Sequence, residues 1–267
     1  MPFVERDGLR YYAFDLLEGA GVKQAVFTRR GGVSPAPWAS LNLGGLNGDA
    51  RENVIENRRR VFDCFGRPVE SLFDVWQVHS ADAVASDRPR PLSAPHQKAD
   101  IILTDRPEVT LFMRFGDCVP LLLVDPRRNV ICLAHAGWEG TVKKVAKAAV
   151  EAMRGQYGSR PEDILAGIGP SVGVHHYQVG ENVIAAAKLA FGEDAKALLP
   201  AYNDRIHFDL WQANRLTLEQ SGVRSVQVSG VCTVCHVDDW FSHRAEHGKT
   251  GRFGALLALA DGQGASA

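Results

Sequence analysis

The centre of the chain reads VPLLLVDPRRNVICLAHA at residues 119–136. Two apolar runs of strand length, VPLLLVD and VICLAHA, flank the turn sequence PRRN, and this pattern predicts a buried β-hairpin. With the turn centred near residue 127, position 118 lies opposite position 137, and position 135 is its diagonal neighbour. Diagonal neighbours in a sheet have Cβ atoms about 7–8 Å apart or somewhat less. The hairpin therefore predicts that Cys118 and His135 meet at one end of a sheet.

The segments on either side of the hairpin have strand-like and helix-like patterns. Strands are expected near residues 23–28, 72–79, 99–105, 164–168, 225–231 and 253–260, and helices over residues 50–66, 141–157, 181–191 and 210–220. The last of these helices begins with a capping-box pattern, Asp209 as N-cap and Gln212 three positions later. Strands and helices mix without a regular βαβ rhythm. We therefore expect an α+β fold, mixed β-sheets layered with helices, in a single domain over residues 1–267.

The composition is that of an ordinary globular protein. Of 267 residues, 45% are hydrophobic and 23% are charged, and the net charge is -1. A dedicated nucleic-acid or anionic-membrane binder normally carries a basic excess, so neither partner is expected. No apolar run approaches the ~18 residues of a membrane span. The N-terminal sequence MPFVERD does not resemble a signal peptide, and the five cysteines are an odd count, so we expect reduced thiols and a cytoplasmic protein. The oligomeric state does not follow from the sequence.

Three residues of metal-ligand type lie at strand ends: His79, Cys118 and His135. Cys118 and His135 are at the end of the hairpin, and His79 ends the strand expected over residues 72–79. Two histidines and one cysteine suit Zn²⁺, and three protein ligands leave a fourth position for water, as catalytic zinc sites do. Alternatively, Cys118 and His135 form a nucleophile and general-base pair. A third interpretation is a small buried cysteine with two hydrogen-bonded histidines. Spacing alone leaves these alternatives open.

A second pattern, CTVCH at residues 232–236, has the spacing of a c-type haem attachment site. Haem attachment is not expected without export, and the run does not open a helix as thioredoxin-like pairs do. It has too few ligands for a zinc site of its own, so we interpret it as a strand end with small buried residues. Upstream, His175 and His176 are adjacent, and adjacent side chains on a strand point to opposite faces. At most one of them is then expected in any site, and a surface loop that takes part in no site is the other interpretation.

Short motifs along the chain resemble those of one family. They are TRRGGVS at 28–34, SLNLG at 40–44, QVH at 77–79, AD at 99–100 with TD at 104–105, DCVP at 117–120, AHAGWEGT at 134–141, IGP at 168–170 and TGR at 250–252. Their order is typical of the YfiH/laccase-domain family, also called the polyphenol oxidase or purine nucleoside phosphorylase family. The resemblance covers about residues 22–258.

The resemblance implies a fold like that of the cysteine hydrolases related to a bacterial cytotoxic factor. It also implies that His79, Cys118 and His135 hold zinc and form the catalytic centre. The matching motifs make Arg29, Asn42, Gln77, Arg244 and Arg252 candidates for substrate binding. The implied activity is a zinc-dependent purine nucleoside phosphorylase acting on adenosine, inosine and methylthioadenosine, with adenosine deaminase activity. Purine nucleoside and phosphate are the implied small-molecule partners.

Two other enzymatic functions compete with this one, and a non-enzymatic alternative is a metal-binding interaction module, which the many family motifs in loops speak against. The first is a Cys–His hydrolase acting on amide bonds, such as a peptidoglycan-precursor editing enzyme. The second is a copper-dependent polyphenol oxidase, or laccase. Multicopper oxidases need many histidine ligands, commonly as His-x-His pairs, whereas this chain has nine histidines and no such pair. Copper can still replace zinc at a His₂Cys site, because Cu²⁺ binds such donors more tightly.

The chain departs from the family pattern where it has Glu139, since family members often have Arg there. An Arg is well shaped to bind a phosphate through two hydrogen bonds, and a carboxylate would repel phosphate. We therefore expect Glu139 to point away from the site or to pair with a cation. Phosphate recognition would then depend on Arg29, Arg244 or Arg252.

Overall fold

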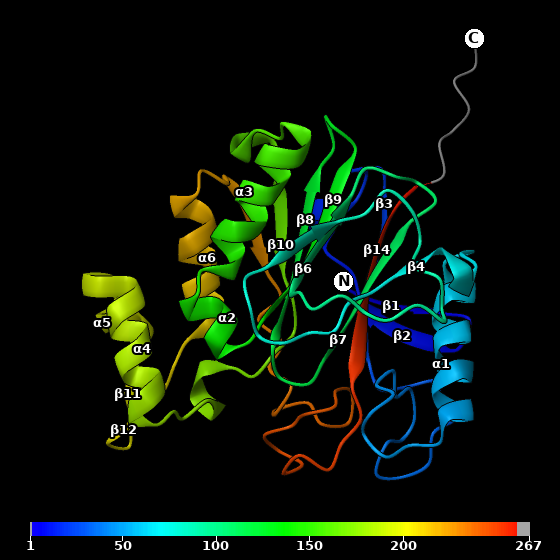
Figure 1. Cartoon of the computed structure of the whole chain (residues 1–267). Helices are drawn as coiled ribbons and strands as arrows, with labels where there is room; N and C mark the ends of the chain where they lie inside the picture. The colour runs from blue at the N-terminus through cyan, green and yellow to red at the C-terminus, as the bar shows by residue number, and fades with distance from the viewer. Residues whose placement is uncertain (1, 261–267) are drawn as a thin grey trace.

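The computed structural model describes residues 2–260 and contains two six-stranded mixed sheets (Figure 1). The first sheet has the strand order β1 (Phe3–Arg6), β2 (Leu9–Tyr12), β3 (Val22–Phe27), β14 (Phe253–Leu259), β7 (Thr110–Phe115) and β4 (Leu72–Phe73). The second has the order β13 (Ser225–Val228), β10 (Leu165–Ile168), β8 (Val119–Asp125), β9 (Val130–Ala136), β6 (Ile101–Thr104) and β5 (Ala83–Ala85). Strands β11 (Ala201–Tyr202) and β12 (Arg205–Ile206) form a small separate ribbon.

The helices lie on the outer faces of the two sheets. They are α1 (Arg51–Cys64), α2 (Trp138–Val142), α3 (Val145–Tyr157), α4 (Glu181–Phe191), α5 (Ala195–Leu198) and α6 (Leu210–Gln220). Helix α1 covers the first sheet, and α3 and α6 cover the second, so the layers run helix, sheet, sheet, helix (Figure 1). None of the helices within residues 2–260 is long and apolar enough to cross a membrane. The α+β class expected from the sequence is confirmed.

The central hairpin has the predicted register. Val119 pairs with Ala136 and Asp125 with Val130, so position 118 lies opposite position 137. The carboxylate of Asp125 closes the turn by accepting hydrogen bonds from the backbone N–H groups of Arg127 and Arg128. The ends of β8 and β9 that carry Cys118 and His135 therefore lie side by side.

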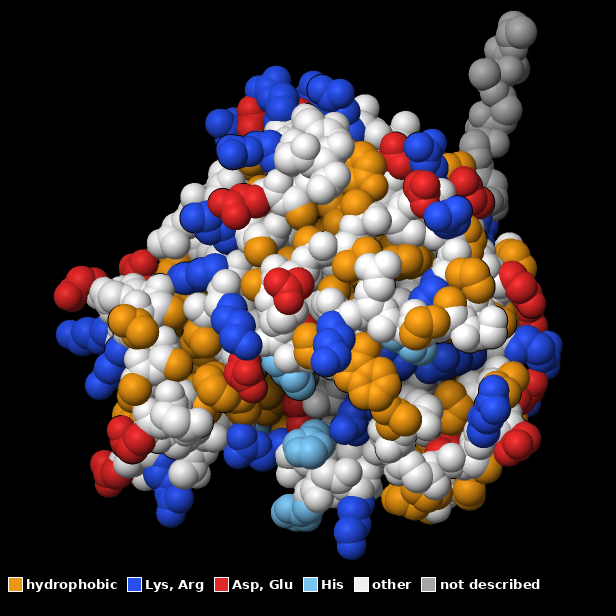
Figure 2. All heavy atoms as spheres, viewed as in Figure 1, with side chains coloured by type: hydrophobic (Ala, Val, Ile, Leu, Met, Phe, Trp, Pro, Cys, Tyr) orange, Lys and Arg blue, Asp and Glu red, His pale blue; other side chains and the backbone are white. Residues whose placement is uncertain are grey.

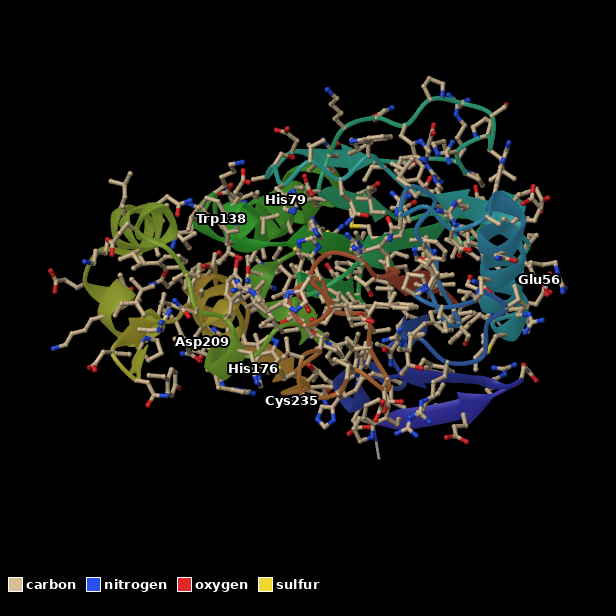
Figure 3. The ribbon with its side chains drawn as sticks, turned by 90° about the horizontal axis from the view of Figure 1, so that it is seen from below. Glu56, His79, Trp138, His176, Asp209 and Cys235 are labelled. Atoms are coloured by element: carbon tan, nitrogen blue, oxygen red, sulfur yellow. The ribbon has the colours of Figure 1, made fainter. Side chains whose placement is uncertain are left out.

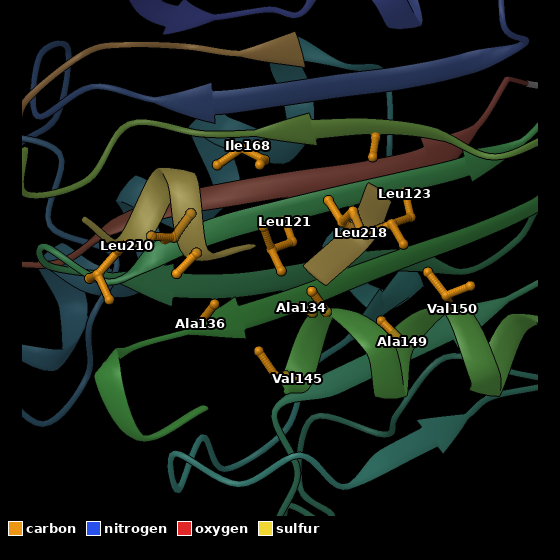
Figure 4. Packing of buried hydrophobic residues seen from close by; sticks show 14 of the residues in the cluster. Leu121, Leu123, Ala134, Ala136, Val145, Ala149, Val150, Ile168, Leu210 and Leu218 are labelled. Carbon is orange, nitrogen blue, oxygen red and sulfur yellow. The ribbon is translucent and has the colours of Figure 1, made fainter. Parts of the chain in front are cut away.

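The hairpin is apolar on both faces because it is the buried layer of the molecule. Leu121 and Ala134 face the helices, where they pack with residues of α3 and α6 (Figure 4). Leu122 and Leu133 face the opposite way, into the core between the two sheets, together with Leu257 of β14. This explains why VPLLLVD and VICLAHA are near-continuous apolar runs rather than alternating ones.

Two expected elements differ from the structure. The strand expected over residues 72–79 is confined to Leu72–Phe73. The buried carboxylate of Asp74 pairs with Arg90 instead, and the chain leaves the sheet as a loop. The helix expected over residues 141–157 is two helices, because Lys144 adopts a left-handed backbone with φ 61° between α2 and α3. Strands β1, β2, β5, β7, β11 and β12 had not been expected.

Leu122→Ala should lower the free energy of unfolding by about 2–5 kcal/mol, because Leu122 is 0% exposed between the two sheets and its loss leaves a cavity. The exposed Leu189, on α4, is the matched control, and Leu189→Ala should change the free energy by less than about 0.5 kcal/mol. Urea unfolding measures both. Equal effects of the two substitutions would contradict the assignment of the inter-sheet core.

Candidate metal centre and its cavity

The structure brings together His79, Cys118 and His135. One ligand atom from each lies within 4.8 Å of the others. The Sγ of Cys118 is 3.9 Å from Nε2 of His79, and the two imidazole ring centroids are 4.9 Å apart. Cys118 directly precedes β8, His135 is in β9, and His79 comes from the loop that follows β4. Three distant parts of the chain thus supply one cluster.

The carboxylate of Asp100 orients two of these three ligands. Its Oδ1 is 2.8 Å from Nδ1 of His135. Its Oδ2 accepts hydrogen bonds from the backbone N–H groups of Val78 (3.1 Å) and Ser80 (2.6 Å), on either side of His79. Burial alone would raise the pKa of Asp100, but the hydrogen bonds from His135, Ser80 and Val78 hold it at about 2. Asp100 is therefore an ionised carboxylate that accepts a hydrogen bond from Nδ1–H of His135, and this leaves Nε2 of His135 free to bind a metal.

The protonation of His135 and Cys118 follows from burial. Burial lowers the pKa of His135, despite the hydrogen bond to Asp100, so its imidazole is neutral near pH 7. Burial, with a smaller contribution from the charge of Asp117, raises the pKa of the Cys118 thiol to about 12. A cation bound beside Cys118 would favour the thiolate form of its side chain.

Gly137 leaves the space that the cluster needs. A Cβ at this position would lie 2.8 Å from Cδ2 of His79 and 2.9 Å from Sγ of Cys118. No larger residue fits without displacing two of the ligands. Two imidazoles, one thiol and this tight approach fit a metal ion with nitrogen and sulfur ligands, such as Zn²⁺.

The cluster lies in a cavity of about 580 Å³. This volume is within the range of about 300–1,000 Å³ that is typical of small-molecule sites. Besides the three ligands, the lining includes Trp76, Gln77, His243 and three arginines: Arg58, Arg114 and Arg252. Figure 2 shows histidine, lysine and arginine side chains around the hollowed lower centre of this face.

The three arginines give the cavity an excess of positive charge. The Nη1 of Arg114 is 3.7 Å from the buried carboxylate of Asp74, which Arg90 shares at 2.7 Å. The guanidinium of Arg58 donates to the carbonyl oxygen of Leu43, and that of Arg252 to the carbonyl oxygen of Gly251. Burial lowers the pKa of Arg58 to about 10, which still leaves it charged near pH 7. Within residues 2–260, neither Arg58 nor Arg252 forms an ion pair with a carboxylate.

Of the expected substrate-binding residues, Gln77 and Arg252 line the cavity, and Asn42 supports it from behind. The side chain of Gln77 is held by the backbone of Arg114, with its Nε2 donating to the carbonyl oxygen at 2.8 Å. Asn42 is 0% exposed, and its Oδ1 accepts a hydrogen bond from the backbone N–H of Arg252. Asn42 therefore positions the segment that carries Arg252.

Arg29 and Arg244 do not line this cavity. Arg29 forms an ion pair with Glu246 at 3.1 Å, and its guanidinium lies over the ring of Phe241. Arg244 is exposed, and its guanidinium lies 5.1 Å from the ring centroid of Tyr177. Glu139 pairs with Lys143 at 3.2 Å, which confirms the expectation that it has a cation as partner.

The sequence analysis missed Arg58 and Arg114. Arg114 interrupts the apolar strand β7, TLFMRF, and a charged residue in such a run was the signal that could have found it. Arg58 is on a helix with many charged residues, but it lies four residues after Val54 and three before Val61, so helical spacing was the signal that could have separated it from its exposed neighbour Arg59.

The fold has two layered mixed sheets, and it places a His₂Cys cluster that could hold a metal ion on the wall of a ligand-sized cavity. Residues 23–260 match the family described as "Multi-copper polyphenol oxidoreductase laccase". A protein of Deinococcus radiodurans named "Purine nucleoside phosphorylase" is 39% identical over 239 residues, which cover 89% of each chain. "Purine nucleoside phosphorylase YlmD" of Bacillus subtilis is 36% identical over 247 residues, 87% of this chain and 86% of that protein.

Solved structures agree with these matches. The crystal structure of YlmD from Geobacillus stearothermophilus has a TM-score of 0.90 and 32% identity, with 97% of this chain and 99% of that chain covered. The YfiH protein of Bacillus licheniformis has a TM-score of 0.89 and 30% identity, with the same coverage. The chain therefore belongs to the laccase-domain family of YfiH and YlmD proteins, as its motifs indicated.

Asp100→Asn should weaken zinc binding at the His79, Cys118 and His135 cluster by about 10- to 100-fold, because the substitution removes the charged partner that orients His135 and the loop of His79. Competition with a chromophoric chelator measures the affinity. Asp82→Asn, on the same loop but with an exposed side chain, is the control and should bind zinc as the unaltered protein does. Equal affinities of the two variants would show that Asp100 does not orient the ligands.

Proposed function

We propose that this protein is a zinc-dependent purine nucleoside phosphorylase that also deaminates adenosine. One observation carries the proposal: the His₂Cys cluster and three arginines face the same cavity. The names of its relatives in Deinococcus radiodurans and Bacillus subtilis support the phosphorylase activity. Adenosine, inosine and methylthioadenosine are the proposed nucleosides.

The proposed metal ligands are His79, Cys118 and His135, and bound zinc would supply Lewis acidity at the cavity wall. Asp100 keeps the Nδ1 proton of His135 in place, so that the imidazole presents Nε2. Cys118 is partly buried, and its thiol lines the cavity beside the two histidines.

Phosphorolysis needs a phosphate dianion beside C1′ of the ribose, and the cavity arginines are the proposed binding groups. Arg252 was expected from the sequence, and Arg58 and Arg114 join it in the lining. Arginine binds phosphate oxygens through two parallel hydrogen bonds. Trp76 is 48% exposed in the same lining and is the proposed surface on which the purine base stacks.

The alternative of a Cys–His hydrolase is less well supported. Such an enzyme needs a thiolate paired with a base, whereas burial raises the pKa of Cys118 to about 12. Its hydrogen-bond partner is His79, at the long distance of 3.9 Å, rather than the expected base His135. A copper-dependent polyphenol oxidase is also less well supported, because multicopper centres need more histidine ligands than this cavity offers.

Cys118→Ala and His135→Ala should each remove one equivalent of zinc per chain and abolish both phosphorolysis and deamination, since each deletes a metal ligand. Zinc is measured by elemental analysis, and products from adenosine are measured with and without phosphate. The exposed His236 is the control, and His236→Ala should keep its zinc and both activities. Full zinc content and normal turnover in either ligand variant would overturn the assignment.

Arg58→Ala should raise the KM for phosphate by about 10- to 150-fold, the effect of losing one charged hydrogen-bond partner, and should spare deamination, which uses water instead of phosphate. Arg244→Ala is the comparison, because Arg244 lies outside the cavity lining. Steady-state kinetics of both activities in both variants make the test. If the KM for phosphate rises in Arg244→Ala and stays unchanged in Arg58→Ala, phosphate binding belongs to the C-terminal loop.

A further inference from the structure

A second cluster of metal-ligand side chains lies outside the cavity. His175, His176, Cys232 and Cys235 each place one ligand atom within 4.8 Å of the others. Nε2 of His175 is 3.0 Å from Sγ of Cys235, and Nδ1 of His176 is 3.6 Å from Sγ of Cys235 and 3.7 Å from Sγ of Cys232. Figure 3 shows His176 and Cys235 as neighbours, well apart from His79. Neither cysteine is in a disulfide.

Two expectations from the sequence were wrong here. His175 and His176 are in the 3₁₀ turn Val174–His176 rather than in a strand, so their rings do not point to opposite faces and lie 4.5 Å apart. Cys235 is exposed in a turn rather than buried at a strand end. The ligands that the run CTVCH lacked come from this distant turn.

The backbone around the cluster holds the two segments together. Ser171 and Cys232 form a parallel β-bridge, and the N–H of Thr233 donates to the carbonyl oxygen of Ser171 at 2.9 Å. The N–H of Gly173 points at Sγ of Cys232, 3.2 Å away. A Cβ at Gly173 would lie 2.7 Å from Cε1 of His175 and 3.1 Å from Cβ of Cys232. Only glycine permits this close approach of the two segments.

We propose that these four residues bind a second zinc ion, as a closed structural site. In a tetrahedral zinc site, bond lengths of about 2.0–2.3 Å put neighbouring ligand atoms about 3.3–3.8 Å apart. The distances of 3.0–3.7 Å given above approach that spacing. Two thiolates with two imidazoles select Zn²⁺ over Mg²⁺ or Ca²⁺, and four protein ligands leave no position for a substrate.

The second site supports the first through Asp117. Thr233, next to Cys232, donates through Oγ1 to Oδ1 of Asp117 at 2.6 Å. Asp117 precedes Cys118 and has a left-handed backbone, φ 80°. The backbone N–H of Val172 donates to the carbonyl oxygen of Asp117 at 3.0 Å, so both zinc-bound segments contact this residue. Zinc at the second site therefore braces the backbone that presents Cys118.

The test counts zinc in protein purified under reducing conditions. The unaltered chain should hold two equivalents, Cys118→Ala and Cys235→Ser one each, and the double variant none. Cys235 is exposed, so Cys235→Ser should fold. His236→Ala is the matched control, because His236 adjoins Cys235 but is not in the cluster, and it should hold two equivalents.

Two further readouts do not depend on activity. Cobalt added to metal-free Cys118→Ala should give a thiolate-to-cobalt charge-transfer absorption, and zinc should raise its Tm. Both effects should be absent from the Cys118→Ala/Cys235→Ser double variant. A Cys118→Ala protein that binds neither metal, with the cysteines reduced, would overturn the second site. If the unaltered chain holds one equivalent of zinc, and Cys235→Ser loses it while Cys118→Ala keeps it, the proposed zinc site of the cavity would be overturned instead.

Discussion

The carboxylate of Asp100 is the group on which the arrangement of the cavity depends. The register of β6 and β9 pairs Ile101 with Ala134, so Asp100, at the start of β6, lies across from His135. One of its oxygens accepts from that histidine, and the other accepts from the loop that carries His79. A buried charge is costly unless it is fully hydrogen-bonded, and the same bonds that satisfy Asp100 orient two ligands.

The second constraint is charge. Asp74 is a fully buried carboxylate, and it partly neutralises Arg90 and Arg114. Arg58 and Arg252 are held by carbonyl oxygens instead, which satisfy the hydrogen bonds of a guanidinium without cancelling its charge. The cavity therefore keeps an excess of positive charge beside the cluster of His79, Cys118 and His135.

The two His/Cys clusters are linked through Asp117 and the residues that hydrogen-bond to it. Asp117 lies between them, adjacent to Cys118 and hydrogen-bonded to Thr233 and to the backbone N–H of Arg244. Arg244, expected from the sequence to bind phosphate through its guanidinium, thus contributes its backbone to the support of Cys118. The segment before β14 therefore lines the cavity, through His243 and Arg252, and also supports Asp117 through the backbone of Arg244.

The sequence by itself determined the hairpin, because the hairpin depends only on interactions between residues that are close in sequence. A turn of known position sets the register of two apolar strands, so the approach of Cys118 to His135 could be predicted, as could the Asp209 cap of α6, whose side chain accepts from Gln212. Only the tertiary structure decided which distant segments meet. Arg58 and Arg114 come together because α1 packs on the sheet that contains β7. His175 and His176 reach Cys232 and Cys235 through a bridge between segments that no local pattern relates. Such contacts depend on long-range sheet pairing and on loop paths, and side-chain periodicity carries no information about either.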